Sequence, residues 1–164
     1  MSRSRVMPFE PEGIDWRSVS PQLRTARHVV LAGFLGVPAL GLTAVAVYFG
    51  GWAWVPAAVV GLVTIWAALV VPRQVRALGY AEREADLLVR KGVLFRSLVV
   101  VPYGRMQFVD VQSGPLARAL GIAQVQLHTA SPGTDASIPG LPPAEAARLR
   151  DRLAALGEAR LAGL

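Results

Sequence analysis

The sequence has no cysteine and only two histidines, and this excludes several kinds of chemistry. A chain without thiols forms no disulfides, has no cysteine nucleophile and supplies no cysteine ligands for zinc or iron–sulfur clusters. The sequence also has no G-x-S-x-G elbow, no P-loop and no G-x-G-x-x-G pattern. We therefore expect no enzymatic activity, no catalytic residues, no metal site and no cofactor.

Charged residues are also scarce, at 17% of the chain, whereas hydrophobic residues make up 53% and the mean hydropathy is +0.43. An average soluble domain is about 25% charged, so this composition indicates a membrane protein. The 17 Lys and Arg against 11 Asp and Glu give a net charge of +6. These basic residues are scattered and no ladder of aromatic residues accompanies them, so we do not expect nucleic acid as a partner.

Two stretches without any charge, residues 29–48 and 52–71, predict a pair of membrane-spanning helices. A 20-residue helix is about 30 Å long, which matches the hydrocarbon core of a bilayer. Only three residues separate the stretches, so the helices should form an antiparallel hairpin. A cleaved signal peptide is disfavoured because the first stretch begins late and is long. A soluble helix pair is disfavoured because 164 residues could hardly enclose it.

Arginines flank both outer ends of the predicted hairpin: Arg17, Arg24 and Arg27 precede the hairpin, and Arg73 and Arg76 follow it. The turn between the two helices carries no charge. The positive-inside rule then places both termini in the cytoplasm of a multi-pass plasma-membrane protein. The turn has the aromatic residues of an outer interfacial belt: Tyr48, Phe49, Trp52 and Trp54. His28 lies beside Arg27 and is interpreted as an interfacial residue.

Small residues recur within both predicted spans and would allow the helices to approach closely: Gly33 and Gly41 in the first, and Ala53, Ala57 and Gly61 in the second. Packing within the hairpin is favoured over a dimerisation face.

The spans have no ionisable residue, which disfavours transport by this chain alone. Three parts follow: an N-terminal cytoplasmic segment (1–28), the hairpin (29–71) and a domain (72–164).

The last part has the pattern of an antiparallel β-domain closed by one helix. Strands are expected at residues 74–80, 85–90, 93–101, 106–112, 124–129 and 137–141, with a helical turn at 116–120 and a loop at 130–136. In the fourth of these strands, Met106 and Phe108 should share one face. The terminal helix should begin at Pro143, bury Ala146, Leu149, Leu153 and Leu156, and fray after Gly157.

Several motifs in this domain resemble the bacterial pleckstrin-homology (PH) proteins of the YdbS-like family. The matching features are an RKG-x-LF-R hairpin, the segment R-x-Q-x-VDVQ-x-GPL-x-R-x-LG, the HTA strand end and the PGL before the helix. The resemblance covers residues 29 to about 156. It implies an α+β membrane protein in which a transmembrane hairpin precedes a PH-like split barrel, normally of seven strands, with a capping helix. The seventh strand is expected in the 130–136 region or at the first strand.

Four basic residues near a predicted hairpin are the candidate contacts for anionic lipid or a partner: Arg90, Lys91, Arg96 and Arg105. Their spacing differs from the pattern that binds phosphoinositides in relatives, which leaves a general attraction to anionic lipid. His128 lies on the polar face of a strand, where a structural hydrogen bond is expected rather than catalysis.

The chain is therefore expected to be a non-enzymatic, membrane-anchored PH-like module. It would present a protein-interaction or assembly surface at the cytoplasmic face, with the bilayer and a protein partner or a second copy as its contacts. An anionic-lipid headgroup sensor and an accessory subunit of a transport or cell-envelope complex remain the alternatives.

Overall fold

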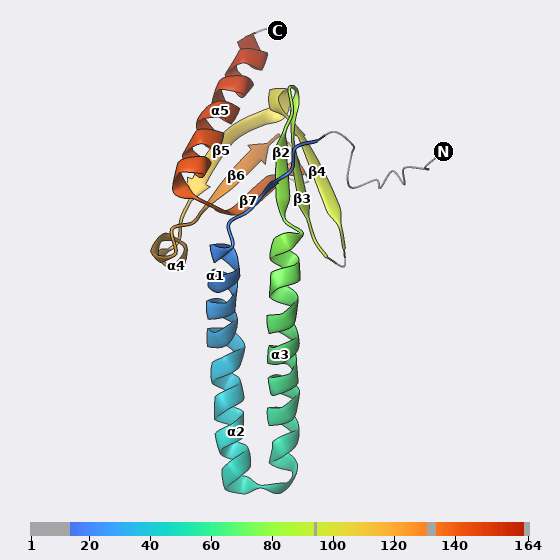
Figure 1. Cartoon of the computed structure of the whole chain (residues 1–164), viewed down its shortest axis with the longest axis vertical. Helices are drawn as coiled ribbons and strands as arrows, with labels where there is room; N and C mark the ends of the chain where they lie inside the picture. Colours follow the sequence, from blue (N-terminus) through green and yellow to red (C-terminus); the bar gives the residue numbers. More distant parts are fainter. Residues whose placement is uncertain (1–13, 94, 131–133, 163–164) are drawn as a thin grey trace, which may run out of the picture.

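The computed structural model describes residues 14–93, 95–130 and 134–162. It has two parts, a long helical hairpin and a domain of two antiparallel sheets with a C-terminal helix (Figure 1). The N-terminal strand and the C-terminal helix both lie at the domain end of the molecule, and the hairpin turn forms the opposite end. This arrangement agrees with the α+β membrane fold expected from the sequence, although the two sheets do not form a closed barrel.

The hairpin helices are longer than the charge-free stretches. The first comprises α1 (Gln22–Leu31), a π-helical turn (Ala32–Gly36) and α2 (Val37–Phe49), and a 3₁₀ turn (Gly51–Ala53) leads into α3 (Trp54–Arg76). Both are long and apolar enough to cross a membrane. Their extra turns enter the domain, where Leu23 and Val75 are buried. The predicted spans are thus the parts of the helices nearest the turn, and the other ends of these helices continue into the protein core.

Packing between the helices near the turn uses alanines. Ala46, Ala53 and Ala57 are buried against one another. A Cβ built on Gly33, Gly41 or Gly61 would meet no atom within 4 Å. The prediction of packing within the hairpin therefore holds for the alanines and is wrong for these glycines.

At the domain end, His28 links the two helices where Pro72 interrupts the hydrogen bonding of α3. Proline has no N–H, so the carbonyl of Ala68 lacks its usual helical donor. His28 Nε2 lies 3.2 Å from that carbonyl oxygen, and Nδ1 lies 2.8 Å from the carbonyl oxygen of Arg24. A ring N–H that donates to the Ala68 carbonyl supplies the hydrogen bond that Pro72 cannot make. The contact joins α1 to α3, and α3 continues past Pro72 to Arg76.

The domain contains seven strands in the described residues. One sheet has the order β1 (Arg17–Ser18), β2 (Gly79–Glu82), β3 (Asp86–Lys91) and β4 (Ser97–Pro102). The other has the order β5 (Met106–Gln112), β6 (Ala123–Thr129) and β7 (Ala136–Leu141). A 3₁₀ turn, η3 (Tyr103–Arg105), joins the sheets, and two helices complete the domain: α4 (Pro115–Ala119) and α5 (Pro143–Ala162).

The seventh strand comes from the N-terminal segment, and neither position expected for it is correct. Arg17 pairs with Tyr80 and Ser18 with Gly79, on the other side of the hairpin in sequence. The Ser20 N–H then donates to the Gly140 carbonyl at 2.8 Å. Gly140 has a φ of +76° and lies so close to the Leu23 side chain that a Cβ there would be 2.8 Å from it. Glycine is therefore required where the N-terminal segment crosses β7.

Two predicted strands begin several residues later than expected. The strand expected at residues 74–80 begins at Gly79, because α3 continues to Arg76 and buries Val75 in the core. The strand expected at 93–101 begins at Ser97, since β3 continues to Lys91, which pairs with Ser97. A loop separates these strands, and Val93 and Phe95, which were expected in a strand, lie in this loop.

Because of a β-bulge, the side chains of β5 lie on other faces of the strand than expected. Met106 pairs with Thr129 and Phe108 with His128, so Gln107 is an extra residue in the ladder. A bulge reverses the alternation of side chains at this point. Met106 is buried in the core, whereas Phe108 is 56% exposed. The prediction that they share a face is therefore wrong.

Helix α5 closes the domain as expected. Ala146, Leu149 and Leu153 have no exposed surface and belong to the main core, with Leu156 packed against it. The helix nevertheless continues past Gly157 to Ala162, and the expected fraying there is wrong. Gly157 itself is buried beside η3 and β5, so packing holds this turn in helical form.

An ionic network joins the N-terminal strand, β2 and α5. Arg148 contacts both Glu82 and Glu145, and Arg17 lies 2.9 Å from Glu145 and 3.8 Å from Glu82. The Tyr80 hydroxyl donates to Glu145 Oε1 at 2.7 Å. Glu82, whose side chain is 7% exposed, also faces Arg152 at 3.1 Å. The buried carboxylate is thus surrounded by three arginines from two chain segments.

The same contacts shift two pKa values in opposite directions. Hydrogen bonds from Arg148, Tyr80 and Arg17 lower the pKa of Glu145 to about 2 against the cost of its desolvation. Burial and the neighbouring Glu145 raise the pKa of Tyr80 to about 12. Glu145 is therefore ionised and Tyr80 neutral at neutral pH.

Gly157→Ala should stabilise the protein. Alanine is the better helix former by about 1 kcal/mol, and its Cβ would lie at ordinary contact distances from the Tyr103 carbonyl (3.9 Å) and Met106 (4.0 Å). Thermal unfolding of the full chain in detergent should show a Tm higher by a few degrees. Ala155→Gly, the reverse change at an exposed position of α5, should lower it. A lower Tm for Gly157→Ala would contradict the packing described for this turn.

The Glu145 contacts should make stability depend on acid pH. The folded pKa of about 2 lies below the ordinary value of 4.5, so the contribution is complete above pH 5 and is lost as the pH falls towards 2. We expect Glu145→Gln to cost about 1 to 2 kcal/mol at pH 7, since water screens part of the pair, and progressively less below pH 5. Tm measured from pH 7 to pH 3 checks this, with Glu158→Gln on the same helix as control. A Tm difference that stays constant with pH would refute it.

Candidate functional site

The structure separates the four basic residues proposed from the sequence. Arg90 and Lys91 end β3, and Arg96 lies in the loop at residues 92–96. Arg105 lies in η3, beyond the opposite end of the β3–β4 hairpin. Six paired residues per strand separate these ends, about 20 Å at the usual rise. Lys91 and Arg96 are therefore near one another, whereas Arg105 belongs to another surface.

Arg90 is held within the protein. Its guanidinium carbon lies 4.7 Å from the centroid of the Trp16 ring, a distance typical of a cation–π contact. Trp16 precedes β1, so this contact adds to the attachment of the N-terminal segment. The outward-facing basic residues at this end are Lys91 and Arg96, both exposed.

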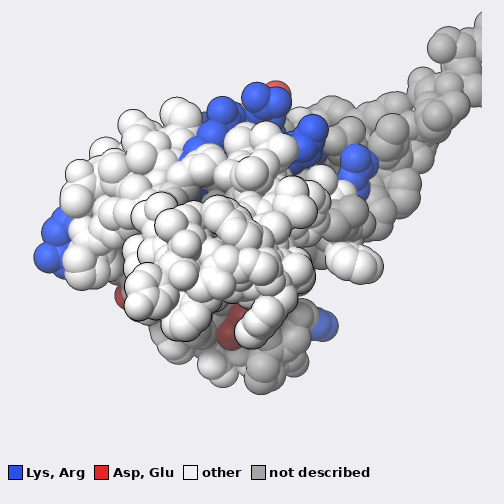
Figure 2. Space-filling model, turned by 90° about the horizontal axis from the view of Figure 1, so that it is seen from below, with Lys and Arg blue, Asp and Glu red and all other residues white. Residues whose placement is uncertain are grey.

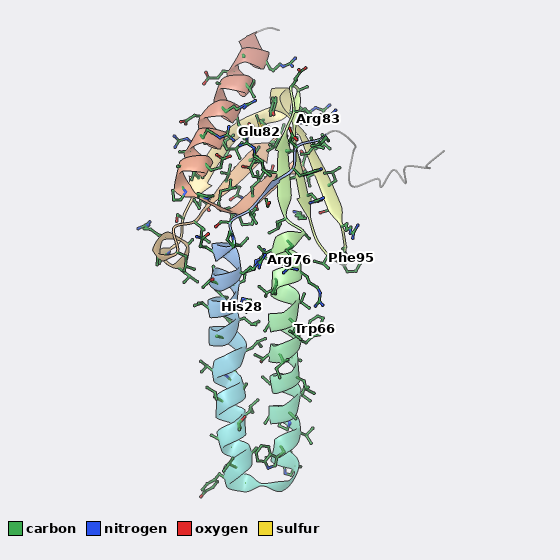
Figure 3. The ribbon with its side chains drawn as sticks, in the orientation of Figure 1. His28, Trp66, Arg76, Glu82, Arg83 and Phe95 are labelled. Carbon is green, nitrogen blue, oxygen red and sulfur yellow. The ribbon has the colours of Figure 1, made fainter. Side chains whose placement is uncertain are left out.

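A groove lies where the domain meets the hairpin, and we call it the membrane groove. Its volume is about 510 Å³, and its walls come from α1, α3, the β3–β4 loop and β7. Arg27 of α1 lines it and donates to Gln74 Oε1 of α3 at 3.0 Å. Figure 3 shows Phe95 at the lower tip of the β3–β4 loop, at the level of Arg76 on α3. The groove thus combines cationic and apolar groups at the membrane end of the domain.

Further basic residues lie around the membrane end of the domain. Figure 2 views the molecule from the hairpin turn and shows Lys and Arg gathered along one side of the domain behind the hairpin. Acidic residues are visible mainly on the other side. The surface that faces the bilayer is therefore polarised in charge.

A second groove, which we call the distal groove, runs between β5 and α5. Its volume is about 290 Å³, and it is lined by Met106, Gln107, Phe108 and Val109 on the strand and by Leu153, Ala154, Gly157 and Glu158 on the helix. β5 is one of the two edge strands of its sheet, so its outer edge faces no other strand in the described part of the chain. Apolar side chains of the strand and the helix meet in this groove beside that edge.

His128 anchors a loop beside this strand. Its ring stacks on Phe108 with centroids 4.3 Å apart, and Nδ1 lies 3.3 Å from Asp135 Oδ2. Asp135 Oδ1 accepts the Thr129 N–H at 2.8 Å, and this hydrogen bond is the main cause of the lowered pKa of Asp135. These contacts are those of a structural histidine. In the described ranges, no three His, Asp or Glu residues are grouped as a metal site would require.

Sequence patterns did not identify three residues of these grooves. Phe95 was assigned to a strand, Arg27 only to a membrane flank, and Gly157 to the end of a helix. Phe95 stands next to Arg96 after a glycine turn, a pattern that could have suggested an exposed interfacial loop. No sequence pattern predicts that Arg27 or Gly157 lines a groove, since the residues next to them in the fold lie on distant segments.

Comparison with known proteins shows the family. The profile of the family described as Bacterial PH domain matches residues 28–157. The chain is also 32% identical over 118 residues to the UPF0699 transmembrane protein YdbS of Bacillus subtilis (strain 168), a match that covers 69% of this chain and 73% of that protein. No solved structure matches the chain. The chain therefore belongs to the bacterial PH domain family and is a YdbS-like membrane protein.

Proposed function

We propose that this chain is a non-enzymatic module, anchored in the plasma membrane with both termini in the cytoplasm, whose PH domain binds an extended protein segment in the distal groove. The observation that carries the proposal is the position of this groove between the free edge of β5 and helix α5. The bound segment would belong to a protein partner or to a second copy of the chain.

The strand edge supplies the main-chain part of this recognition. An outermost strand presents N–H and C=O groups at the spacing of a β-ladder, and an added peptide strand satisfies them. The bulge at Gln107 bends β5 and limits this pairing to the residues after it. A segment would therefore add along Phe108 to Gln112.

The residues that line the groove on both sides supply the selectivity. Phe108 is 56% exposed although it is a large apolar residue, and a partner side chain could cover it. Gly157 contributes no side chain to the wall and leaves room for an apolar group of the partner. We therefore expect the segment to carry an apolar residue opposite Phe108.

The location of the groove suits a partner in the cytoplasm. Met106 follows η3, at the end of the β3–β4 hairpin opposite the β3–β4 loop. Helix α5 continues from the sheets away from the hairpin (Figure 1). A partner could therefore reach this groove without competing with the bilayer.

The proposed topology has a direct test. A reporter fused after Leu164 should report a cytoplasmic location, and one inserted between Gly50 and Gly51 an external one, because the arginines flank only the outer ends of the hairpin. Cleavage of the C-terminal domain by protease added to intact cells would contradict this orientation.

The distal groove is tested by site-specific photo-crosslinking in native membranes. A photoreactive residue at Gln107 should form adducts with protein, and the same residue at exposed Arg150 should not. Gly157→Leu should reduce the Gln107 adducts at least severalfold, because the new side chain fills the groove.

Ala155→Leu adds the same side chain at an exposed position of α5 outside the groove, and it should leave the adducts unchanged. The Tm of Gly157→Leu reports whether the domain stays folded. Adducts that persist in folded Gly157→Leu, or their absence from Gln107 altogether, would overturn the proposed binding mode.

A further inference from the structure

The β3–β4 loop extends to the level of a residue that the bilayer should cover. Val70 is the second-last residue of the charge-free stretch 52–71 and lines the membrane groove together with Phe95. The side chain of Phe95 is 91% exposed. A domain loop that shares a groove with the end of a membrane span lies at the depth of the lipid headgroups.

The charges of this groove suit an anion. Arg27 and Lys91 both line it, and the exposed Arg96 is the next residue after Phe95 in the loop. Among the described residues that line it there is no Asp or Glu. Basic groups at a membrane surface attract anionic headgroups with about 1 kcal/mol per residue.

The shape of the loop is fixed by one glycine. Gly92 has a φ of +97°, and a Cβ at this position would lie 1.9 Å from the Phe95 carbonyl oxygen. Only glycine permits this close approach. The turn therefore holds Phe95 at the tip, beside Arg96, in a defined arrangement.

We propose that the membrane groove binds the headgroup phosphate of an anionic phospholipid from the leaflet nearest the domain, between Arg27 and Lys91, while Phe95 inserts among the adjoining lipids. The apolar part of the groove, which includes Val70, would contact the upper acyl chain. This inference concerns the membrane end of the domain, and it stands independently of the distal groove and its partner.

The test uses the full chain in nanodiscs of phosphatidylcholine with phosphatidylglycerol. After transfer to detergent, native mass spectrometry counts the phosphatidylglycerol that the protein retains. The double variant Lys91→Gln with Arg96→Gln should weaken retention about fivefold for each charge removed.

The matched control removes two charges at the opposite end of the β3–β4 hairpin, by Arg83→Gln with Arg105→Gln. It should retain as much phosphatidylglycerol as the unmodified chain. An equal loss in both double variants would show a general charge effect and overturn the site, as would unchanged retention in Lys91→Gln with Arg96→Gln. Displacement of the lipid by inorganic phosphate would mean that the groove takes a free anion, which also overturns the lipid assignment.

Insertion of Phe95 has its own readout, because the chain has no cysteine. In nanodiscs, Phe95→Cys should react with a water-soluble maleimide severalfold more slowly than Phe108→Cys, which replaces an exposed residue of the distal groove. In detergent-free vesicles of phosphatidylcholine alone the protection should persist, since insertion depends on depth rather than on headgroup charge. Equal reaction rates at the two positions would overturn the insertion.

Discussion

The pairing of β1 with β2 is the constraint on which the rest of the structure depends. These strands are neighbours in the sheet, yet the whole membrane hairpin lies between them in sequence. The two ends of the hairpin must therefore meet the sheet side by side. Adjacent strands lie about 5 Å apart and packed helices about 8 to 10 Å apart, so short connections can join one to the other. The hairpin is consequently an insertion into the PH domain, attached to it by both helices.

The attachments of this insertion differ in chemistry on its two sides. Within the domain, apolar contacts of Leu23 and Val75 bury the helix ends in the core, and the Glu82 network fixes β1 to α5. At the bilayer boundary, the contacts are polar: His28 bridges to the Ala68 carbonyl and Arg27 to Gln74. These two contacts pair polar groups between the helices at a depth where an unsatisfied carbonyl in lipid is costly.

The sequence allowed the membrane hairpin, the family and the terminal helix to be predicted, because each depends on local pattern. Charge-free length identifies a span, and the spacing of Leu149 and Leu153 identifies a buried helix face. The errors arose where distant segments decide the outcome. Two residues of β1 have no pattern of their own, and α3 continues past Pro72 beside a histidine that belongs to another helix. The bulge at Gln107 depends on the partner strand. For the same reason, the basic residues near a predicted turn separated into two surfaces once the register of β3 and β4 was known.

The insertion also sets an order of events during synthesis. Residues 17–18 leave the ribosome before the hairpin, and their partner strand is made only after both membrane helices. Domains generally fold as units as the chain emerges, but this sheet cannot gain its first strand until α3 is complete. A polypeptide that starts after the hairpin lacks this strand and also lacks Val19 and Leu23 of the core. With the topology proposed above, membrane insertion is a step in the folding of the domain.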